Sequence, residues 1–200
     1  PLVNQGFKDI SENFANIYGK AAVIIHMLRQ ELGDADFFRG LKHYLQKHRH
    51  QNVNAADLAR AFEEATGKNV DFFFDQWVYG AGAPRFEVSH TYDAAAKQVK
   101  MDVKQTQKVE GKVGLFSVPV NVEVTTAEGR KSFPIRVSQA SQSFAFPAES
   151  KPLMVLFDKG NKVLKAVEFP KGADEMNYQL KNAESVADRL DAARALGDPK

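Results

Sequence analysis

The chain has 200 residues, no cysteine, and a formal net charge of +2 from 27 basic and 25 acidic side chains. The apolar fraction of 44% is enough for a packed core and excludes an intrinsically disordered chain. Without cysteine there can be no disulfide, thiolate metal site or cysteine nucleophile, and the interspersed charges argue against nucleic-acid binding. No apolar stretch approaches the roughly 20 residues of a membrane-spanning helix, and a cytoplasmic, periplasmic or secreted location stays open.

Residues 1–84 repeat apolar side chains at helical spacing, which predicts a lobe of four short helices. The first helix ends at Gly33, and Asp34 is expected to cap the second. Asn54 is expected to cap a third helix that ends at Gly67. The fourth runs from about Asp71 through Trp77 and Val78.

The period of the apolar residues changes from 3.6 to two after Pro84. Turn signals at 93–96, 127–129 and 158–161 separate short alternating runs, which predicts six or seven strands in an antiparallel sandwich. These runs centre on residues 86–92, 99–103, 118–124, 133–137, 144–146, 153–157 and 163–169.

Helical spacing returns from Glu175 to Leu196, in a segment too short to be a domain by itself. Its apolar stripe is predicted to include Ala183, Val186 and Leu190. The predicted fold class is therefore α+β and multidomain: a helical lobe, an antiparallel β-sandwich and the start of a C-terminal helical segment.

Tyr18, at the start of the first helix, is the candidate catalytic residue. A phenol has a pKa of about 10, so it stays protonated at neutral pH and can donate a hydrogen bond to an oxyanion. From spacing alone, the alternative that Tyr18 is an ordinary amphipathic residue at a helix end is favoured. Its neighbour Lys20 lies off the apolar stripe and is interpreted as a solvated side chain without a role.

The basic stretch from Lys42 to His50 contains three of the five histidines. Two metal ligands on one helical face need a spacing of three or four. Here His43 and His48 are five apart, and His48 and His50 are two apart. We interpret the stretch as a helix C-terminus whose cations suit the helix dipole. His26, within an apolar stripe, is expected to be a buried, hydrogen-bonded core histidine.

Two segments carry a resemblance to a known family. Residues 13–29 read NFANIYGKAAVIIHMLR, and a later run reads DQWVYGAGAP over residues 75–84. This pattern resembles the last part of the catalytic domain of the M1 family of zinc aminopeptidases. That family places its catalytic tyrosine in Tyr-x-Lys-Gly-Ala before an apolar run and Met-Leu-Arg. Tyr18 and Lys20 match, and Ala21 departs from the usual glycine.

The resemblance implies three regions. Residues 1–84 would be the helical C-terminal lobe of a thermolysin-like metallopeptidase catalytic domain, residues 85–171 a β-sandwich domain, and residues 172–200 the start of a helical C-terminal domain. Trp77 and the glycines at 80 and 82 resemble the family's junction between domains. Because the chain begins at Pro1 with neither Met nor a leader, we expect it to be a segment of a longer protein.

The resemblance also implies a zinc-dependent enzyme that removes N-terminal residues from peptides. In this family zinc is held by His-Glu-x-x-His and a later Glu, the metal-bound water attacks the peptide carbonyl, and a Gly-x-Met-Glu-Asn loop holds the substrate's amine. None of these motifs occurs in the 200 residues. We therefore expect Tyr18 to stabilise the oxyanion, and the zinc-binding half of the catalytic domain to lie upstream as a partner. This chain alone is expected to hold no zinc and to be inactive.

An alternative from a different class is a non-catalytic interaction or scaffold protein on the same architecture, since families of this kind can lose their metal and keep their fold. A third alternative, a sandwich that binds ligand with its sheet, lacks an exposed aromatic cluster to support it. An upstream His-Glu-x-x-His would decide for the enzyme.

Overall fold

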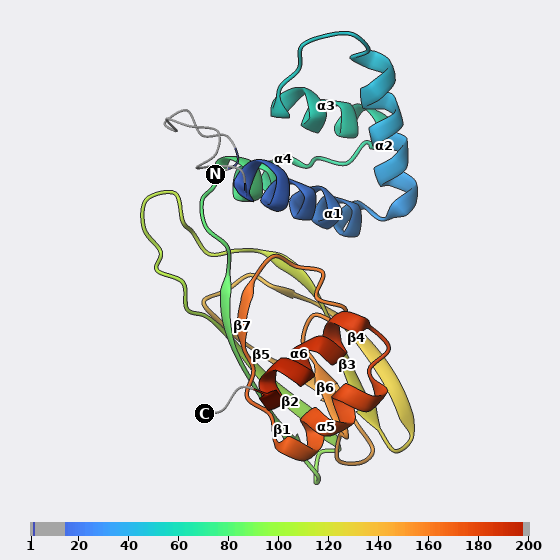
Figure 1. The fold of residues 1–200 in the computed structure, drawn as a ribbon, viewed down its shortest axis with the longest axis vertical. Coiled ribbons are helices and arrows are strands. Elements are labelled where there is room, and N and C mark those ends of the chain that lie inside the picture. The colour runs from blue at the N-terminus through green and yellow to red at the C-terminus, as the bar shows by residue number, and fades with distance from the viewer. Residues whose placement is uncertain (1, 3–14, 198–200) are drawn as a thin grey trace. The chain divides into compact units, whose positions relative to one another are not determined.

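The computed structural model describes residue 2 and residues 15–197, with side chains at residue 2 and from residue 18 onward. It divides the chain into two compact units (Figure 1). Unit 1 comprises Pro1–Gly82 and the loop Val109–Gly114, and unit 2 comprises Ala83–Lys108 and Leu115–Lys200. The division into regions 1–84, 85–171 and 172–200 stays a prediction.

Unit 1 is helical, as predicted. The expected fourth helix is a single α-helical turn that continues in the wider π-helical form, and a π-helical turn also precedes the first helix. In chain order the elements are η2 (Ala15–Lys20), α1 (Ala21–Leu32), α2 (Asp34–Lys47), α3 (Ala55–Thr66), α4 (Asp71–Phe74) and η3 (Asp75–Tyr79).

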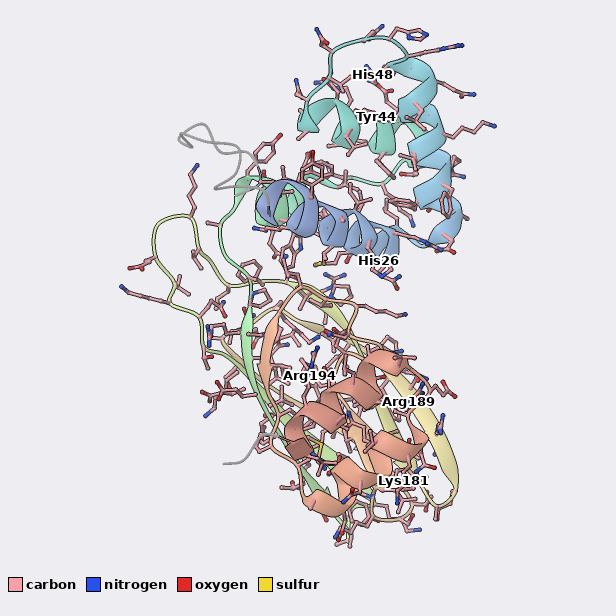
Figure 2. The ribbon with its side chains drawn as sticks, in the orientation of Figure 1. His26, Tyr44, His48, Lys181, Arg189 and Arg194 are labelled. Carbon is pink, nitrogen blue, oxygen red and sulfur yellow. The ribbon has the colours of Figure 1, made fainter. Side chains whose placement is uncertain are left out.

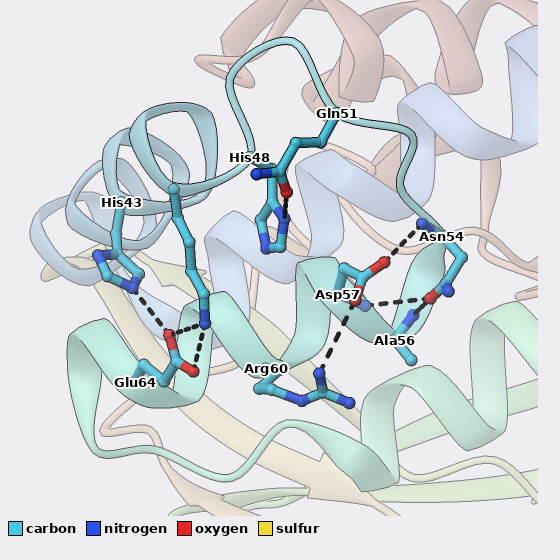
Figure 3. Close-up of polar contacts among 9 residues, drawn as sticks. His43, His48, Gln51, Asn54, Ala56, Asp57, Arg60 and Glu64 are labelled. Atoms are coloured by element: carbon cyan, nitrogen blue, oxygen red, sulfur yellow. Dashed lines mark hydrogen bonds and ion pairs between the residues drawn. The ribbon is translucent and has the colours of Figure 1, made fainter.

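Local capping chemistry sets most of these helix ends. Gly33 ends α1 with φ +81°, and Gly67 ends α3 in the left-handed conformation with φ +71°, where glycine has no Cβ penalty. Asn54 forms a capping box with Asp57 at the start of α3, as Figure 3 shows. The prediction that Asp34 caps α2 is wrong: Gly33 occupies the cap position, and the Asp34 carboxylate accepts two hydrogen bonds from Arg29.

The core of unit 1 is aromatic. Trp77 and Phe62 are 2% and 1% exposed, and the ring centroids of Phe37 and Phe62 are 5.6 Å apart. This contact between α2 and α3 depends on Gly40, because a Cβ added there would lie 2.3 Å from Cδ1 of Phe62. The aromatic residues thus fix the positions of α2 and α3 within unit 1.

Unit 2 contains the predicted strands as two sheets. One has the order β5-β2-β1-β7 and the other the order β4-β3-β6. All pairs are antiparallel except the short parallel pair of β1 with β7. The strands are β1 (Arg85–Asp93), β2 (Gln98–Gln105), β3 (Val118–Thr126), β4 (Gly129–Val137), β5 (Ser141–Pro147), β6 (Met154–Leu156) and β7 (Ala166–Glu168).

Burial along the strands explains the layers of unit 2. In β2 every second residue is buried and its neighbours are exposed, the pattern of a sheet with one solvated face. The whole of β6 and residues 122–125 of β3 are buried on both faces, so a second layer must cover the outer face of that sheet. Two helices, α5 (Ala173–Asn182) and α6 (Val186–Gly197), lie over it (Figure 1).

The predicted single helical segment from Glu175 to Leu196 is therefore two helices, with a break at residues 183–185. Ala183 packs against Met154 and Leu156 as expected. Val186 and Leu190, however, are 70% and 45% exposed, whereas Asp188 is buried on the inner face of α6. Spacing alone placed the buried face of α6 on the wrong side. Among the described helices, none combines the length and the apolar character needed to cross a bilayer.

Candidate functional site

Tyr18 lies in the π-helical turn η2, which runs directly into α1. The connecting residue Lys20 has ordinary right-handed helical dihedrals, so the backbone passes from one element to the other without a break. The Tyr18 side chain is 64% exposed. Wide helical turns of this kind occur frequently at functional sites. The side chain is therefore largely exposed, and its catalytic role stays a prediction.

Lys20 is not the solvated side chain that the sequence suggested. It is half-buried, and its Nζ donates a hydrogen bond to the backbone oxygen of Gly82 at 3.4 Å. Burial lowers the pKa of the Lys20 ammonium below its ordinary value. The contact joins the start of α1 to the end of unit 1, 62 residues later in the sequence. Lys20 thus holds the turn that carries Tyr18 against the Gly80–Gly82 segment.

The Gly80–Gly82 segment is the tight connection by which the chain leaves η3, after the buried Trp77. A Cβ at Gly80 would lie 2.5 Å from the backbone oxygen of Gln76, and Gly82 has φ +79°. The amide of Ala81 donates to the oxygen of Lys112 at 2.9 Å, which attaches the loop Val109–Gly114 to unit 1. Each glycine therefore has a structural reason: close approach of backbone to backbone at Gly80 and a positive φ at Gly82.

The outer face of α1 is apolar and exposed. Val23 and Ile25 are 37% and 40% exposed, while Ile24, Met27 and Leu28 on the opposite side are buried. A helix that is apolar on most of its circumference is typical of one enclosed by other polypeptide. Among the described residues of unit 1, none buries Val23 or Ile25 on this outer face.

The prediction that His26 is buried is wrong. Its side chain is exposed on α1, between the exposed Ile25 and the buried Met27 (Figure 2). The sequence showed an apolar neighbourhood, but burial depends on which side of the helix faces the core. His26 lies on the outer face.

The basic end of α2 pairs with α3 (Figure 3). Glu64 accepts hydrogen bonds from Lys47 Nζ at 2.6 and 2.7 Å, and its Oε2 lies 2.9 Å from Nε2 of His43. These bonds lower the pKa of Glu64 to about 2. A carboxylate held by a lysine is an ion pair between helices, and across the described residues no three His, Cys, Asp or Glu side chains form a group able to hold a metal.

The structure thus brings Lys20 into contact with Gly82, and Tyr18 lies in the same helical turn as Lys20. The Tyr18 phenol and the Lys20 ammonium are both hydrogen-bond donors. Residues of this kind can stabilise negative charge that develops on a substrate.

The chain is similar in sequence to known peptidases. Residues 3–77 match the family model described as the Peptidase family M1 domain. Aminopeptidase N of Lactococcus lactis subsp. lactis is 35% identical over 107 residues, which cover 54% of this chain and 12% of that protein. Aminopeptidase N of Escherichia coli K12 is 24% identical over 196 residues, which cover 90% of this chain and 22% of that protein.

A solved structure shares the fold. The crystal structure of Legionella pneumophila aminopeptidase A in complex with aspartic acid superposes with a TM-score of 0.80 at 16% identity, covering 95% of this chain and 22% of that one. At this identity the likeness concerns the fold alone. The chain therefore spans between 12% and 22% of the length of these three proteins.

Proposed function

The chain belongs to the M1 family of peptidases, and we propose that it is the part of a zinc-dependent aminopeptidase that supplies the oxyanion-stabilising tyrosine, Tyr18. The reaction would be removal of N-terminal residues from peptides. The observation that carries the proposal is the position of Tyr18: inside the family-matched residues 3–77, at the start of α1, and 64% exposed.

The contribution of this chain's residues is electrostatic. When a peptide carbonyl is attacked, its oxygen gains negative charge, and a donor aimed at that oxygen stabilises the transition state more than the ground state. Tyr18 would donate its O–H to this oxygen. Lys20, through its hydrogen bond to Gly82, would hold the helical turn in place and so act as a positioning residue.

The zinc ligands are proposed to lie in polypeptide upstream of this chain. The 200 residues contain no His-Glu-x-x-His, and the part of the chain that the structure describes offers no convergent group of ligands. We therefore propose that the zinc ligands lie outside this chain and that this chain alone is inactive.

The proposed partner is the zinc-binding half of the catalytic domain, supplied by upstream polypeptide. The exposed face of α1 supports this. Val23 and Ile25 follow the turn that carries Tyr18 and are exposed on the described part of unit 1. An apolar surface next to the candidate catalytic residue suits an obligate contact, because burying it would also enclose the phenol.

The test compares two polypeptides: the 200-residue chain and the product of the same reading frame extended upstream. Hydrolysis of an aminoacyl reporter and zinc content after dialysis are measured for both. The proposal expects an upstream His-Glu-x-x-His, about one zinc and turnover in the extended protein, and neither zinc nor turnover in the short chain.

Either of two outcomes would overturn the proposal. A stoichiometric zinc in the short chain, lost on substitution of a histidine, would contradict the assignment of the metal. An extended protein that folds but lacks both zinc and turnover would favour the interaction or scaffold alternative.

A further inference from the structure

Unit 2 contains a cavity of about 460 Å³ between the β7 region, α5 and α6. Its volume lies within the roughly 300–1,000 Å³ typical of small-molecule sites. The cavity has no part in the proposed peptidase chemistry, because all of its lining residues lie between positions 156 and 195 of unit 2. Among the described residues, two of its charged groups, Lys171 and Asp188, form no direct ion pair with another side chain.

Lys171 is the cationic group in the wall. Its Nζ donates to Oε1 of Gln179 at 2.6 Å and lies 4.5 Å from the centroid of the Phe169 ring. Both contacts are to uncharged groups, and within the described chain no carboxylate forms an ion pair with Lys171. The carboxylates of Glu175, Asp188 and Asp191 act on this ammonium only from beyond ion-pair distance. A largely desolvated ammonium without a direct anionic contact is energetically unfavourable, so this position favours an anionic group brought by a ligand.

Asp188 is the anionic group, on the inner face of α6 and 5% exposed. Both of its carboxylate oxygens accept from the single amide of Gly160, each at 3.0 Å. Among the described residues no Lys, Arg or His forms an ion pair with it. One neutral N–H leaves most of the acceptor capacity of a carboxylate unused, so this group favours a cationic group from a ligand.

Gln179 fixes the two charged groups relative to each other. Its Oε1 accepts from Lys171, and its Nε2 donates to the backbone oxygen of Asp188 at 2.8 Å. Gln179 is itself 4% exposed. The same buried amide therefore contacts the Lys171 ammonium and the backbone of Asp188, which preorganises these two residues. The other charged residues of the wall have ion pairs: Lys165 with Asp158 and Arg194 with Asp191.

The rest of the wall mixes polar side chains with a group of apolar ones. Phe157 is buried in it, Phe169 and Met176 are half-buried, and Val167 is 42% exposed. An apolar side chain of a ligand would lose water against these residues. A nucleotide or other polyanion suits the site poorly, because Asp188 and Asp191 would repel its phosphates.

We propose that this cavity binds a small zwitterion with an apolar side chain, of the class of free amino acids, with its carboxylate on Lys171 and its ammonium on Asp188. The two charges of such a ligand would form direct ion pairs with the two wall residues that have none among the described residues, and its side chain would cover Phe169 and Met176. The inference does not rest on the proposed peptidase function, because every residue it uses lies in unit 2.

The test uses three probes of similar size on the 200-residue chain: L-leucine, 4-methylpentanoate, which lacks the amine, and isoamylamine, which lacks the carboxylate. Titrations by calorimetry and by backbone amide shifts report affinity and location. Leucine is expected to bind most tightly and isoamylamine most weakly, with shifts at Gly160 and Gln179. Equal affinity for leucine and isoamylamine, or no shift at the cavity for any probe at tens of millimolar, would overturn the proposal.

Substitutions sharpen the test. Lys171→Met keeps the length of the side chain and removes the charge, and should weaken leucine binding at least about 10-fold, as expected for loss of a charged hydrogen bond. The matched control is Lys181→Met, an exposed lysine on the same helix as Gln179, which should bind leucine like the wild type. Undiminished binding by Lys171→Met would contradict the assignment.

The contribution of Asp188 is measured on the wild type, because Asp188→Asn could disturb its contact with Gly160. The preference for leucine over 4-methylpentanoate reports the ammonium interaction without any substitution. A preference of about 10-fold or more is expected, and equal binding would show that Asp188 does not contact the ligand.

Discussion

The two units differ in how deeply their ion pairs are buried. In unit 1 each described ion pair has at least one side chain more than a third exposed, such as Arg29 with Asp34 and Lys47 with Glu64. Unit 2 buries some of its charges: Lys165 and Asp158 are 4% and 2% exposed and form an ion pair. Exposed pairs contribute little to stability, whereas breaking a buried pair leaves an uncompensated charge.

This difference indicates where substitutions should matter. Unit 1 depends on aromatic packing and leaves an apolar face and a tyrosine exposed, as expected for a unit that works against another polypeptide. Unit 2 depends on charges placed under α5 and α6, where Glu123 is 1% exposed and bonded to Lys159 at 2.5 Å. Its stability should therefore respond to charge and pH far more than that of unit 1.

The largest effect is expected from Lys165→Met in unit 2. Asp158 would keep its bond from the amide of Val163 but lose the ammonium, leaving a buried carboxylate without a cation. The expected loss is about 3–5 kcal/mol of unfolding free energy, measured by urea denaturation. Lys151→Met, at an exposed lysine, is the control. A loss below about 1 kcal/mol would mean that the buried pair is not what distinguishes unit 2.

Lys171→Met, in contrast, should increase the stability of the protein. Burial lowers the pKa of Lys171 from its ordinary 10.5 to about 8, so between these values the unfolded chain binds more protons and stability rises with pH. Below pH 8 the folded chain carries the full penalty of a buried ammonium. Removing the ammonium should raise the unfolding free energy by roughly 2 kcal/mol at pH 7. The gain is less than the full desolvation penalty because the contacts of Lys171 with Gln179 and Phe169 are also lost.

The pH dependence checks the origin of that gain. Unfolding free energies of wild type and Lys171→Met are compared from pH 7 to 10.5, and the difference should shrink above pH 8 and vanish near 10.5. A variant less stable than the wild type at pH 7 would contradict the claim that desolvation of the Lys171 ammonium lowers the stability of the folded chain.

In unit 1 a packing change should matter more than a charge change. Alanine is a better helix former than glycine by about 1 kcal/mol, but a Cβ at Gly40 would overlap the buried Phe62 ring, and overpacking costs about 1–3 kcal/mol. Gly40→Ala is therefore expected to be destabilising by about 1 kcal/mol net in thermal and urea unfolding. Gly19→Ala, where no atom lies within 4 Å of the added Cβ, should be neutral or stabilising. Stabilisation by Gly40→Ala would refute the packing argument.

The smallest effect is expected from Glu64→Gln in unit 1. Hydrogen bonds from Lys47 and His43 lower the pKa of Glu64 to about 2, from 4.5. A lowered carboxylate pKa contributes stability that is present above pH 4.5 and lost as the pH falls through about 2. The deficit of Glu64→Gln should therefore be small at pH 6 and disappear near pH 2. Glu63→Gln on the same helix is the control, and a deficit independent of pH would argue against the ion pair.

The features predicted correctly from the sequence are local ones. Asn54 and Gly67 bound α3 because capping needs only a few neighbouring residues, and the strands of unit 2 follow from alternation along each run. The exposed His26 and Val186 show where this reasoning fails. An apolar stripe says that a helix has a buried side, but the layer that covers it comes from residues far away in the sequence.

The same reason explains why the cavity of unit 2 was not predicted. Lys171, Gln179 and Asp188 come from a connecting segment and two different helices, and no spacing rule brings them together. Asp188 does not belong to the apolar stripe that the spacing predicted for this segment. By contrast, Tyr18 could be singled out because its pattern with Lys20 matches a family motif, although its catalytic role rests on the proposal above.

The central claim is tested most directly by the turnover number of Tyr18→Phe in the upstream-extended enzyme. The substitution removes one hydroxyl and keeps the ring, so the melting temperature and zinc content should match the wild type. Loss of an oxyanion donor predicts a fall in kcat of roughly 10²-fold or more, with kcat/KM falling in parallel. Tyr44→Phe on α2 should leave both unchanged. A Tyr18→Phe enzyme with near-normal kcat would contradict the account.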